Sequence, residues 1–129
     1  MPSRVLIADD VPDIRLFLHA MLTMDGYFEV VGEASSGEEA LQKSRDAQPD
    51  VVLLDMNMPG RSGLDVLPDI RAALPRAIIA VFSGFEERAL GQRTLHLGAD
   101  VYLEKGTPAF DVVERLKSLV EARGASSDQ

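Results

Sequence analysis

Three short segments of the chain are apolar without interruption, and they indicate the class of fold. They cover residues 5–8, 51–54 and 77–82. Strands with apolar side chains on both faces are typical of a parallel sheet that is covered on both sides. Residues 28–34 and 100–104 are two weaker strand candidates.

Amphipathic segments separate these strands. In the first, apolar residues recur at the i, i+3, i+4, i+7 and i+8 spacing of a helix that packs one face on a core. These residues are Ile14, Phe17, Leu18, Met21 and Leu22. A second helix is predicted over residues 37–48, because Ser36 and Glu39 form a capping-box signature and Pro49 follows.

The next two helices, over residues 63–74 and 86–97, each contain a helix-breaking residue. Pro68 lies inside the earlier one and predicts a kink or a late start, and Gly91 weakens the later one. The apolar stripe of the later helix is thin and consists mainly of Ala89, Leu90 and Leu97. We therefore expect this helix to be the least firmly held element.

The last helix is predicted to begin near residue 108. Thr107 suits the N-cap and Pro108 the first helical position. The residues expected to face the core are Val113, Leu116, Leu119 and Val120. Strand and helix thus alternate five times, which predicts an α/β fold with right-handed crossovers and a doubly wound open sheet.

The composition fits one domain and limits its partners. Thirteen Lys and Arg residues against 21 Asp and Glu residues give a net charge of −8, so nucleic acid and anionic membranes are poor direct partners. The absence of Cys excludes disulfides, a thiol nucleophile and Cys-ligated zinc. The apolar segment near the start is too short for a signal peptide or a membrane span, so we expect a cytoplasmic protein.

Polar residues follow four of the predicted strands at the point where each strand ends. Asp9 and Asp10 follow the first, Asp55 the third, Ser83 the fourth and Lys105 the fifth. The carboxyl ends of parallel strands share one edge of the sheet, so these residues are expected to meet in one cleft. Taken alone, the Asp9-Asp10 pair would also fit a helix N-cap.

Three carboxylates in one cleft repel one another unless a cation joins them. Carboxylate and water oxygens suit Mg²⁺, which keeps several waters for phosphate oxygens. Lys105 adds a positive charge and Ser83 a hydroxyl donor. The five residues therefore predict a cradle for a phosphoryl group, with one carboxylate as the nucleophile.

Four segments that include these residues resemble the receiver domains of response regulators. They are VLIADD (5–10), VVLLDMNMPG (51–60), FSG (82–84) and GADVYLEK (98–105). The resemblance extends from about residue 4 to residue 122. It implies a five-stranded parallel sheet of flavodoxin-like order 2-1-3-4-5, with helices on both faces.

The resemblance also implies a role for each carboxylate. Asp55 would be the phosphoacceptor, and Asp10 and Asp55 would bind Mg²⁺ together with the backbone carbonyl of Asn57. Asp9 would act mainly through metal-bound water. The phosphodonor would be a histidine kinase or a histidine phosphotransfer protein.

Further roles follow from the same resemblance. Lys105 would pair with the phosphoryl group, Ser83 would turn toward it after transfer, and Tyr102 would swing inward with Ser83. Gly84 would leave room for the phosphodonor. Gly106 stands where many receivers have proline, so a cis peptide is not expected after Lys105.

The expected output is a change of the face formed by residues 86–97, residues 100–104 and the last helix. This face would control a downstream protein target, an output domain outside the present sequence, or a phosphorylation-dependent dimer. The Lys-Gly-Thr-Pro sequence at 105–108 is similar to receivers that precede helix-turn-helix output domains. We assign residues 1–123 to the receiver and residues 124–129 to a flexible tail or truncated linker.

Other functions were weighed against this one. A phosphohydrolase or phosphotransferase acting on small molecules needs a general acid and a lid, and Asn57 cannot act as the acid. A flavin carrier would have a phosphate-binding first loop, whereas Asp9, Asp10 and Asp13 would repel the flavin phosphate. A receiver fold that serves only as a phosphorylation-independent docking module remains the alternative. The chain is expected to catalyse only its own phosphorylation and the hydrolysis of its phosphoaspartate.

Overall fold

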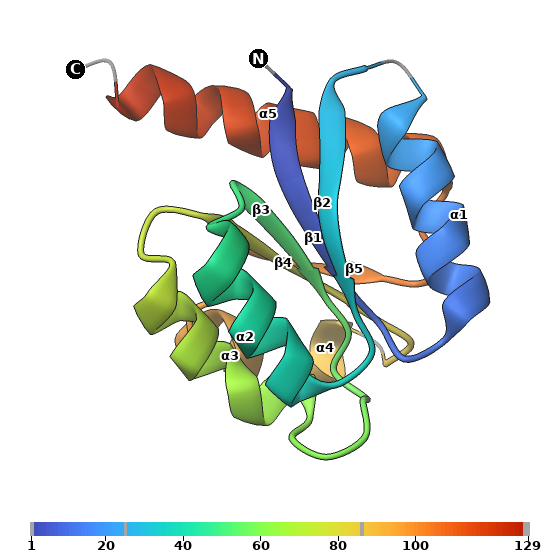
Figure 1. Ribbon diagram of the computed structural model, residues 1–129, viewed down its shortest axis with the longest axis vertical. Coiled ribbons are helices and arrows are strands. Elements are labelled where there is room, and N and C mark those ends of the chain that lie inside the picture. The colour runs from blue at the N-terminus through green and yellow to red at the C-terminus, as the bar shows by residue number, and fades with distance from the viewer. Residues whose placement is uncertain (1, 25, 86, 128–129) are drawn as a thin grey trace.

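The computed structural model describes residues 2–24, 26–85 and 87–127, which contain one parallel sheet flanked by helices (Figure 1). The strands are β1 (Ser3–Ala8), β2 (Phe28–Ala34), β3 (Val51–Leu54), β4 (Ile78–Ser83) and β5 (Val101–Glu104). The helices are α1 (Pro12–Thr23), α2 (Gly37–Ala47), α3 (Gly63–Ala73), α4 (Glu87–His96) and α5 (Ala109–Ser127). The strand order β2-β1-β3-β4-β5 confirms the predicted doubly wound fold.

The helices form two layers, one on each face of the sheet. Figure 1 shows α1 and α5 on one face, and α2, α3 and α4 on the other. Two clusters of buried side chains correspond to these layers, one containing Leu18 of α1 and Leu116 of α5, the other containing Leu41 of α2 and Ile70 of α3. The sheet therefore lies between two hydrophobic cores.

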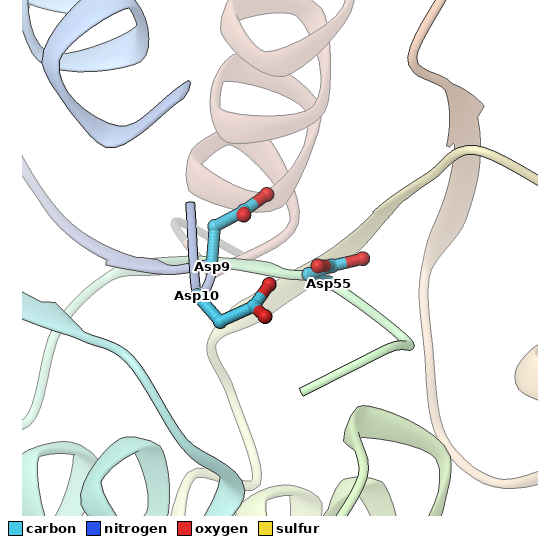
Figure 2. Close-up of side chains that lie close together, drawn as sticks. All are labelled: Asp9, Asp10 and Asp55. Carbon is cyan, nitrogen blue, oxygen red and sulfur yellow. The ribbon is translucent and has the colours of Figure 1, made fainter. Parts of the chain in front are cut away.

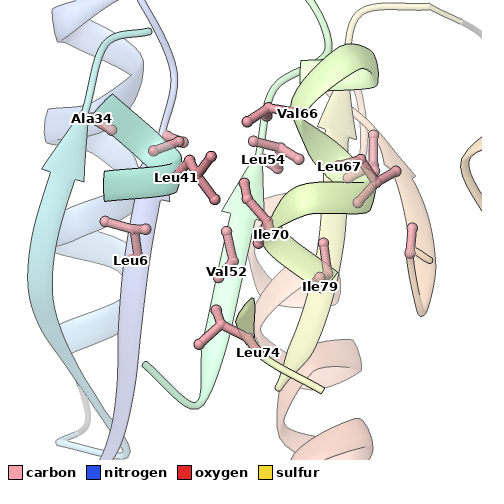
Figure 3. Close-up of a cluster of buried hydrophobic side chains, with 14 of the residues drawn as sticks. Leu6, Ala34, Leu41, Val52, Leu54, Val66, Leu67, Ile70, Leu74 and Ile79 are labelled. Carbon is pink, nitrogen blue, oxygen red and sulfur yellow. The ribbon is translucent and has the colours of Figure 1, made fainter. Parts of the chain in front are cut away.

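Alternate residues of the central strands point into the two cores. Leu6, Val52 and Ile79 pack with α2 and α3, as Figure 3 shows, whereas their neighbours Ile7 and Leu53 pack with α1 and α5. All five are at most 1% exposed. This two-sided burial explains the uninterrupted apolar runs in the sequence.

Side-chain caps define the starts of α2 and α3. The Ser36 Oγ accepts a hydrogen bond from the Glu39 N–H at 3.2 Å, which confirms the predicted cap of α2. The Ser62 Oγ caps α3 in the same way through the Asp65 N–H. We expected a kink or a late start; α3 begins at Gly63 and continues through Pro68, so the late start is excluded and the kink stays a prediction.

In α1, one assignment of a core residue was wrong. Leu18 and Leu22 are buried, and Ile14 and Met21 pack against the same core, but Phe17 is 56% exposed. Phe17 lies at the edge of the apolar stripe, so the helix can bury the centre of the stripe and leave this ring in solvent.

In α4, the side of the helix that faces the core also differs from expectation. Leu90 and Leu97 pack against the core as predicted, but Ala89 is exposed. Gly91 and Thr94 are buried in its place. The small residue at position 91 therefore lies on the packed side of α4, rather than being only a weak point in the helix.

The last helix begins one residue later than predicted. The Pro108 carbonyl accepts the first helical hydrogen bond, from the Val112 N–H at 3.1 Å, so Pro108 rather than Thr107 occupies the capping position. Val113 and Leu116 are buried, as predicted. The helix includes Gly124, where the sequence suggested a tail. Within the described residues, no helix combines the length and hydropathy of a bilayer-spanning segment.

Candidate functional site

The carboxyl ends of β1, β3, β4 and β5 meet at one edge of the sheet, and three acidic residues gather there. Asp9 and Asp10 follow β1 and Asp55 follows β3, as Figure 2 shows. One carboxylate oxygen from each of the three lies within 4.8 Å of the others. Asp9 and Asp55 are buried, with 2% and 4% exposure, whereas Asp10 is exposed.

Lys105 bridges the two buried carboxylates. Its Nζ lies 2.9 Å from the Asp9 Oδ2 and 3.4 Å from the Asp55 Oδ2. The Lys105 backbone N–H donates to the Ser83 carbonyl at 2.7 Å, which ties the end of β5 to the end of β4. The backbone of the sheet therefore positions the Lys105 ammonium group.

The electrostatics of the site favour an additional cation. Burial and the negative charge of Asp9 raise the pKa of Asp55, although Lys105 and the Asn57 N–H lower it in part. Burial lowers the pKa of Lys105, but its hydrogen bond to Asp9 and the charges of Asp55 and Asp9 outweigh burial and raise it. One ammonium group thus does not compensate the acidic cluster, and the donor set of carboxylate oxygens fits a hard divalent ion such as Mg²⁺.

Both oxygens of the Asp9 side chain already have partners. The Oδ1 accepts a hydrogen bond from the Val11 N–H at 3.0 Å, and the Oδ2 contacts Lys105. Val11 is the residue that precedes the first turn of α1, so Asp9 also helps to start that helix. The exposed Asp10 carboxylate lies at the open side of the cluster.

The loop after β3 is fixed by close contacts with Asp55 and with the core. The Asn57 N–H donates to the Asp55 Oδ1 at 3.3 Å, and Met56 and Met58 are buried on the core side of the loop. A Cβ at position 63 would lie 1.9 Å from the Asp55 carbonyl oxygen, so only glycine fits there. The sequence pattern did not predict a role for Gly63 at the site, although its place at the start of α3 is compatible with a close backbone approach.

The loop after β4 connects Ser83 to Tyr102. The Ser83 Oγ accepts a hydrogen bond from the Phe85 N–H at 3.2 Å, and the Tyr102 hydroxyl donates to the Phe85 carbonyl at 2.8 Å. Tyr102 is only 6% exposed and belongs to the core on the face of the sheet that α2, α3 and α4 cover, so its ring already points inward. Gly84 is exposed, with open space where a side chain would be.

All the peptide bonds that the structure describes are trans, including the one between Lys105 and Gly106. This agrees with the expectation from glycine at position 106.

Comparisons with known proteins place this site in a known family. The model of the response regulator receiver domain matches residues 5–117. Transcriptional regulatory protein PdtaR of Mycobacterium tuberculosis is 39% identical over 120 residues, which are 93% of this chain and 58% of PdtaR. Chemotaxis protein CheY of Thermotoga maritima is 36% identical over 119 residues, which are 92% of this chain and 98% of CheY.

A solved structure shows the same similarity in three dimensions. In the complex of CheX with CheY, BeF3 and Mg²⁺ from Borrelia burgdorferi, the matched chain has a TM-score of 0.87 and 29% sequence identity. The match covers 92% of this chain and 90% of that one. The present sequence therefore corresponds to nearly all of a CheY chain and to little more than half of PdtaR.

Proposed function

The chain belongs to the response regulator receiver domain family, and from this we propose that Asp55 is the aspartate that takes up the phosphoryl group. Members of this family act in two-component signalling by accepting a phosphoryl group on an aspartate with Mg²⁺. The observation that carries the assignment is the position of Asp55, a buried carboxylate at the end of the central strand β3, in contact with Lys105 and close to the other two carboxylates.

The proposed Mg²⁺ ligands are the carboxylates of Asp10 and Asp55 and the backbone carbonyl of Asn57. Asp9 is proposed to act mainly through metal-bound water, which is the role that the family membership implies for it. Bound Mg²⁺ supplies positive charge that neutralises the carboxylates and the oxygens of the incoming phosphoryl group. A CheY complex with BeF3 and Mg²⁺ of similar fold supports this cofactor.

In the proposed transfer, an Asp55 oxygen attacks the phosphorus of a phosphohistidine. The new O–P bond forms as the P–N bond breaks, and the electron pair returns to the imidazole nitrogen. Lys105 would stabilise the negative charge on the phosphoryl oxygens, and Gly84 leaves space for the donor. Beyond this transfer and the hydrolysis of its own phosphoaspartate, we expect no catalytic activity.

The proposed switch runs through the loop after β4. A phosphoryl group on Asp55 offers acceptor oxygens to the Ser83 hydroxyl, and rotation of the Ser83 side chain toward them would move its Oγ away from the Phe85 N–H. The Phe85 carbonyl also holds the Tyr102 hydroxyl, so a movement of this loop would reach Tyr102. The face formed by α4, β5 and α5 is therefore proposed to control the output.

Three further assignments complete the proposal. The phosphodonor is a cytoplasmic histidine kinase or phosphotransfer protein that meets the exposed apolar surface of α1, which includes Leu16 at 70% exposure. The output is a downstream protein, a phosphorylation-dependent dimer, or a domain that follows the receiver, since PdtaR is longer than this chain. The receiver is assigned to residues 1–123, and residues 124–129, of which 124–127 continue α5, are assigned to a tail or linker.

The test is phosphorylation by a small acyl phosphate in the presence of Mg²⁺, followed by intact mass spectrometry. The wild-type chain should gain one phosphoryl group, and Asp55→Asn should gain none. Exposed Asp46 of α2 provides a matched control, because Asp46→Asn should be phosphorylated like the wild type. If the wild type gains no phosphoryl group, the phosphorylation-independent docking module becomes the better account.

A further inference from the structure

Arg15, on the first turn of α1, reaches back to the loop that carries Asp9 and Asp10. Its Nη1 donates a hydrogen bond to the Asp9 backbone carbonyl at 2.7 Å. Its Nε donates to the Glu33 Oε1 of β2 at 3.2 Å. The side chain is 19% exposed, so the guanidinium is largely enclosed between α1, β2 and this loop.

The carbonyl that Arg15 holds belongs to the peptide between Asp9 and Asp10. On its other side, the Asp9 N–H donates to the Ala34 carbonyl at 2.9 Å, and the Asp9 side chain is fixed by Val11 and Lys105. Asp9 is therefore held at its N–H, its side chain and its carbonyl, the last of these by Arg15.

Asp10 depends on this peptide for its direction. Its side chain is exposed, and the plane of the peptide before it sets where its Cα–Cβ bond points. A guanidinium that hydrogen-bonds the carbonyl opposes rotation of that plane. Glu33 in turn fixes the guanidinium, because a planar fork can satisfy two acceptors at once.

We infer that Arg15 is a positioning residue for the metal site: through the Asp9 carbonyl it holds the Asp10 carboxylate where it can bind Mg²⁺. This inference rests on the proposed function, in which Asp10 is a Mg²⁺ ligand. In this role Arg15 would contact neither the ion nor the phosphoryl group, and would act only through the peptide whose carbonyl it binds.

Electrostatics and positioning predict opposite effects of removing Arg15. Loss of a positive charge near a cation site strengthens cation binding by Coulomb's law alone. Loss of an outer partner that orients a ligand weakens binding, typically 10–100-fold. The sign of the change in Mg²⁺ affinity therefore distinguishes a positioning residue from a neighbouring charge.

The experiment is an NMR titration of the metal-free protein with Mg²⁺. For Arg15→Gln we expect binding about tenfold weaker than for the wild type, with partial recovery in Arg15→Lys. Arg45→Gln is the matched control, because Arg45 is exposed in the last turn of α2, at the opposite end of the strands, and should leave the affinity unchanged. Unchanged or tighter binding in Arg15→Gln would overturn the inference.

Two additional variants keep the test decisive. Glu33→Gln retains Arg15 but weakens its anchor. Because the loss of this negative charge by itself also weakens cation binding, the decisive readout for Glu33→Gln is the Asp10 amide signal rather than the affinity, and it remains available even if Arg15→Gln folds poorly. In metal-free Arg15→Gln or Glu33→Gln, the amide signal of Asp10 should shift or broaden, because its peptide is less constrained; an unchanged signal in both would contradict the role. Asp10→Ala tests the proposed metal site separately, and wild-type affinity in that variant would remove both proposals.

Discussion

At the scale of single residues, Asp55 stands out because the fold places it in an environment that disfavours its charge. The carboxylate is almost completely buried, and the charge of Asp9 lies nearby. Both effects raise the pKa of Asp55 and exceed the opposing effect of Lys105. In the metal-free protein, the ionised form of Asp55 therefore destabilises the fold. Binding of Mg²⁺ or reaction with a phosphodonor would relieve this destabilisation.

We predict that Asp55→Asn stabilises the metal-free protein at neutral pH by more than the ~0.5 kcal/mol typical of surface substitutions. The folded-state pKa of Asp55 is raised, so between the unfolded and the folded pKa the folded protein binds more protons. As the pH falls through the folded-state pKa of Asp55, protonation of this carboxyl increases the free energy of unfolding of the wild type. The difference in stability between Asp55→Asn and the wild type should therefore become smaller. Urea unfolding in a chelator at several pH values measures both effects.

Glu29, exposed on β2, provides a control for the loss of one negative charge. Glu29→Gln should change the stability little and without this pH dependence. An Asp55→Asn variant that is less stable than the wild type in the chelator would show that Lys105 compensates the buried charge fully.

Gly63 gives a second prediction at the same scale. A methyl group at this position would overlap the Asp55 carbonyl oxygen, so Gly63→Ala must displace the phosphoacceptor backbone. We expect a loss of about 1–3 kcal/mol in unfolding free energy, together with slower phosphorylation. Gly106 has open space at its Cβ position, so Gly106→Ala should be almost neutral in urea unfolding. Equal stability of the two variants would contradict the close contact.

At the scale of elements, the carboxyl end of α5 is joined to the rest of the fold through Asp100. The Asp100 carboxylate lies between α4 and β5, and it accepts hydrogen bonds from Arg71 of α3 at 2.6 Å and from Arg123 of α5 at 2.9 Å. It also accepts the Ile79 N–H at 2.8 Å. One partly buried carboxylate thus connects a strand of the sheet with helices on both of its faces.

We predict that Asp100→Ala lowers the free energy of unfolding by about 2 kcal/mol, because it leaves two guanidinium groups and a backbone N–H without this acceptor. The control is Glu114→Ala, which removes the ion pair of the exposed Glu114 carboxylate with Lys117 within α5 and should cost less than about 1 kcal/mol. Urea unfolding of the two variants tests the difference. Similar small losses would mean that Asp100 makes only ordinary surface contacts.

Contacts between elements could be predicted from the sequence only in part. The meeting of Asp9, Asp55 and Lys105 could be predicted, because parallel strands bring their carboxyl ends to one edge whatever the side chains are. The contact of Arg15 with the Asp9 carbonyl could not, because it depends on how far a long side chain reaches between elements. Phe17 was misassigned because periodicity predicts the direction of a stripe but not its buried width.

At the scale of the whole molecule, the site and the proposed output face share the loop that follows β4. Ser83 lies at the site, Phe85 follows it, and Tyr102 reaches the same loop from β5. Helix α4, which comes next, packs with a buried glycine, Gly91, and two half-buried leucines. In the proposed switch, a small movement at Ser83 would bias α4 between two arrangements.

We predict that beryllofluoride with Mg²⁺ changes hydrogen exchange mainly between residues 83 and 105. The reason is that the acceptor atoms of the phosphoryl mimic draw the Ser83 side chain toward Asp55 and away from the Phe85 N–H, which frees the loop that holds Tyr102. Exchange measured by mass spectrometry, with Asp55→Asn as the unresponsive control, gives the comparison. Changes confined to α1 and α2 would place the output face elsewhere on the molecule.

The central claim is that Asp55 receives the phosphoryl group, and direct localisation of that group tests it most closely. The wild-type chain is phosphorylated with a small acyl phosphate and Mg²⁺. The phosphoaspartate that forms on the protein is trapped by borohydride reduction, and the modified residue is identified by peptide mass spectrometry. The account predicts modification at Asp55 alone, lost when a chelator removes Mg²⁺. Modification at Asp9 or Asp10 instead, or incorporation that persists without Mg²⁺, would contradict it.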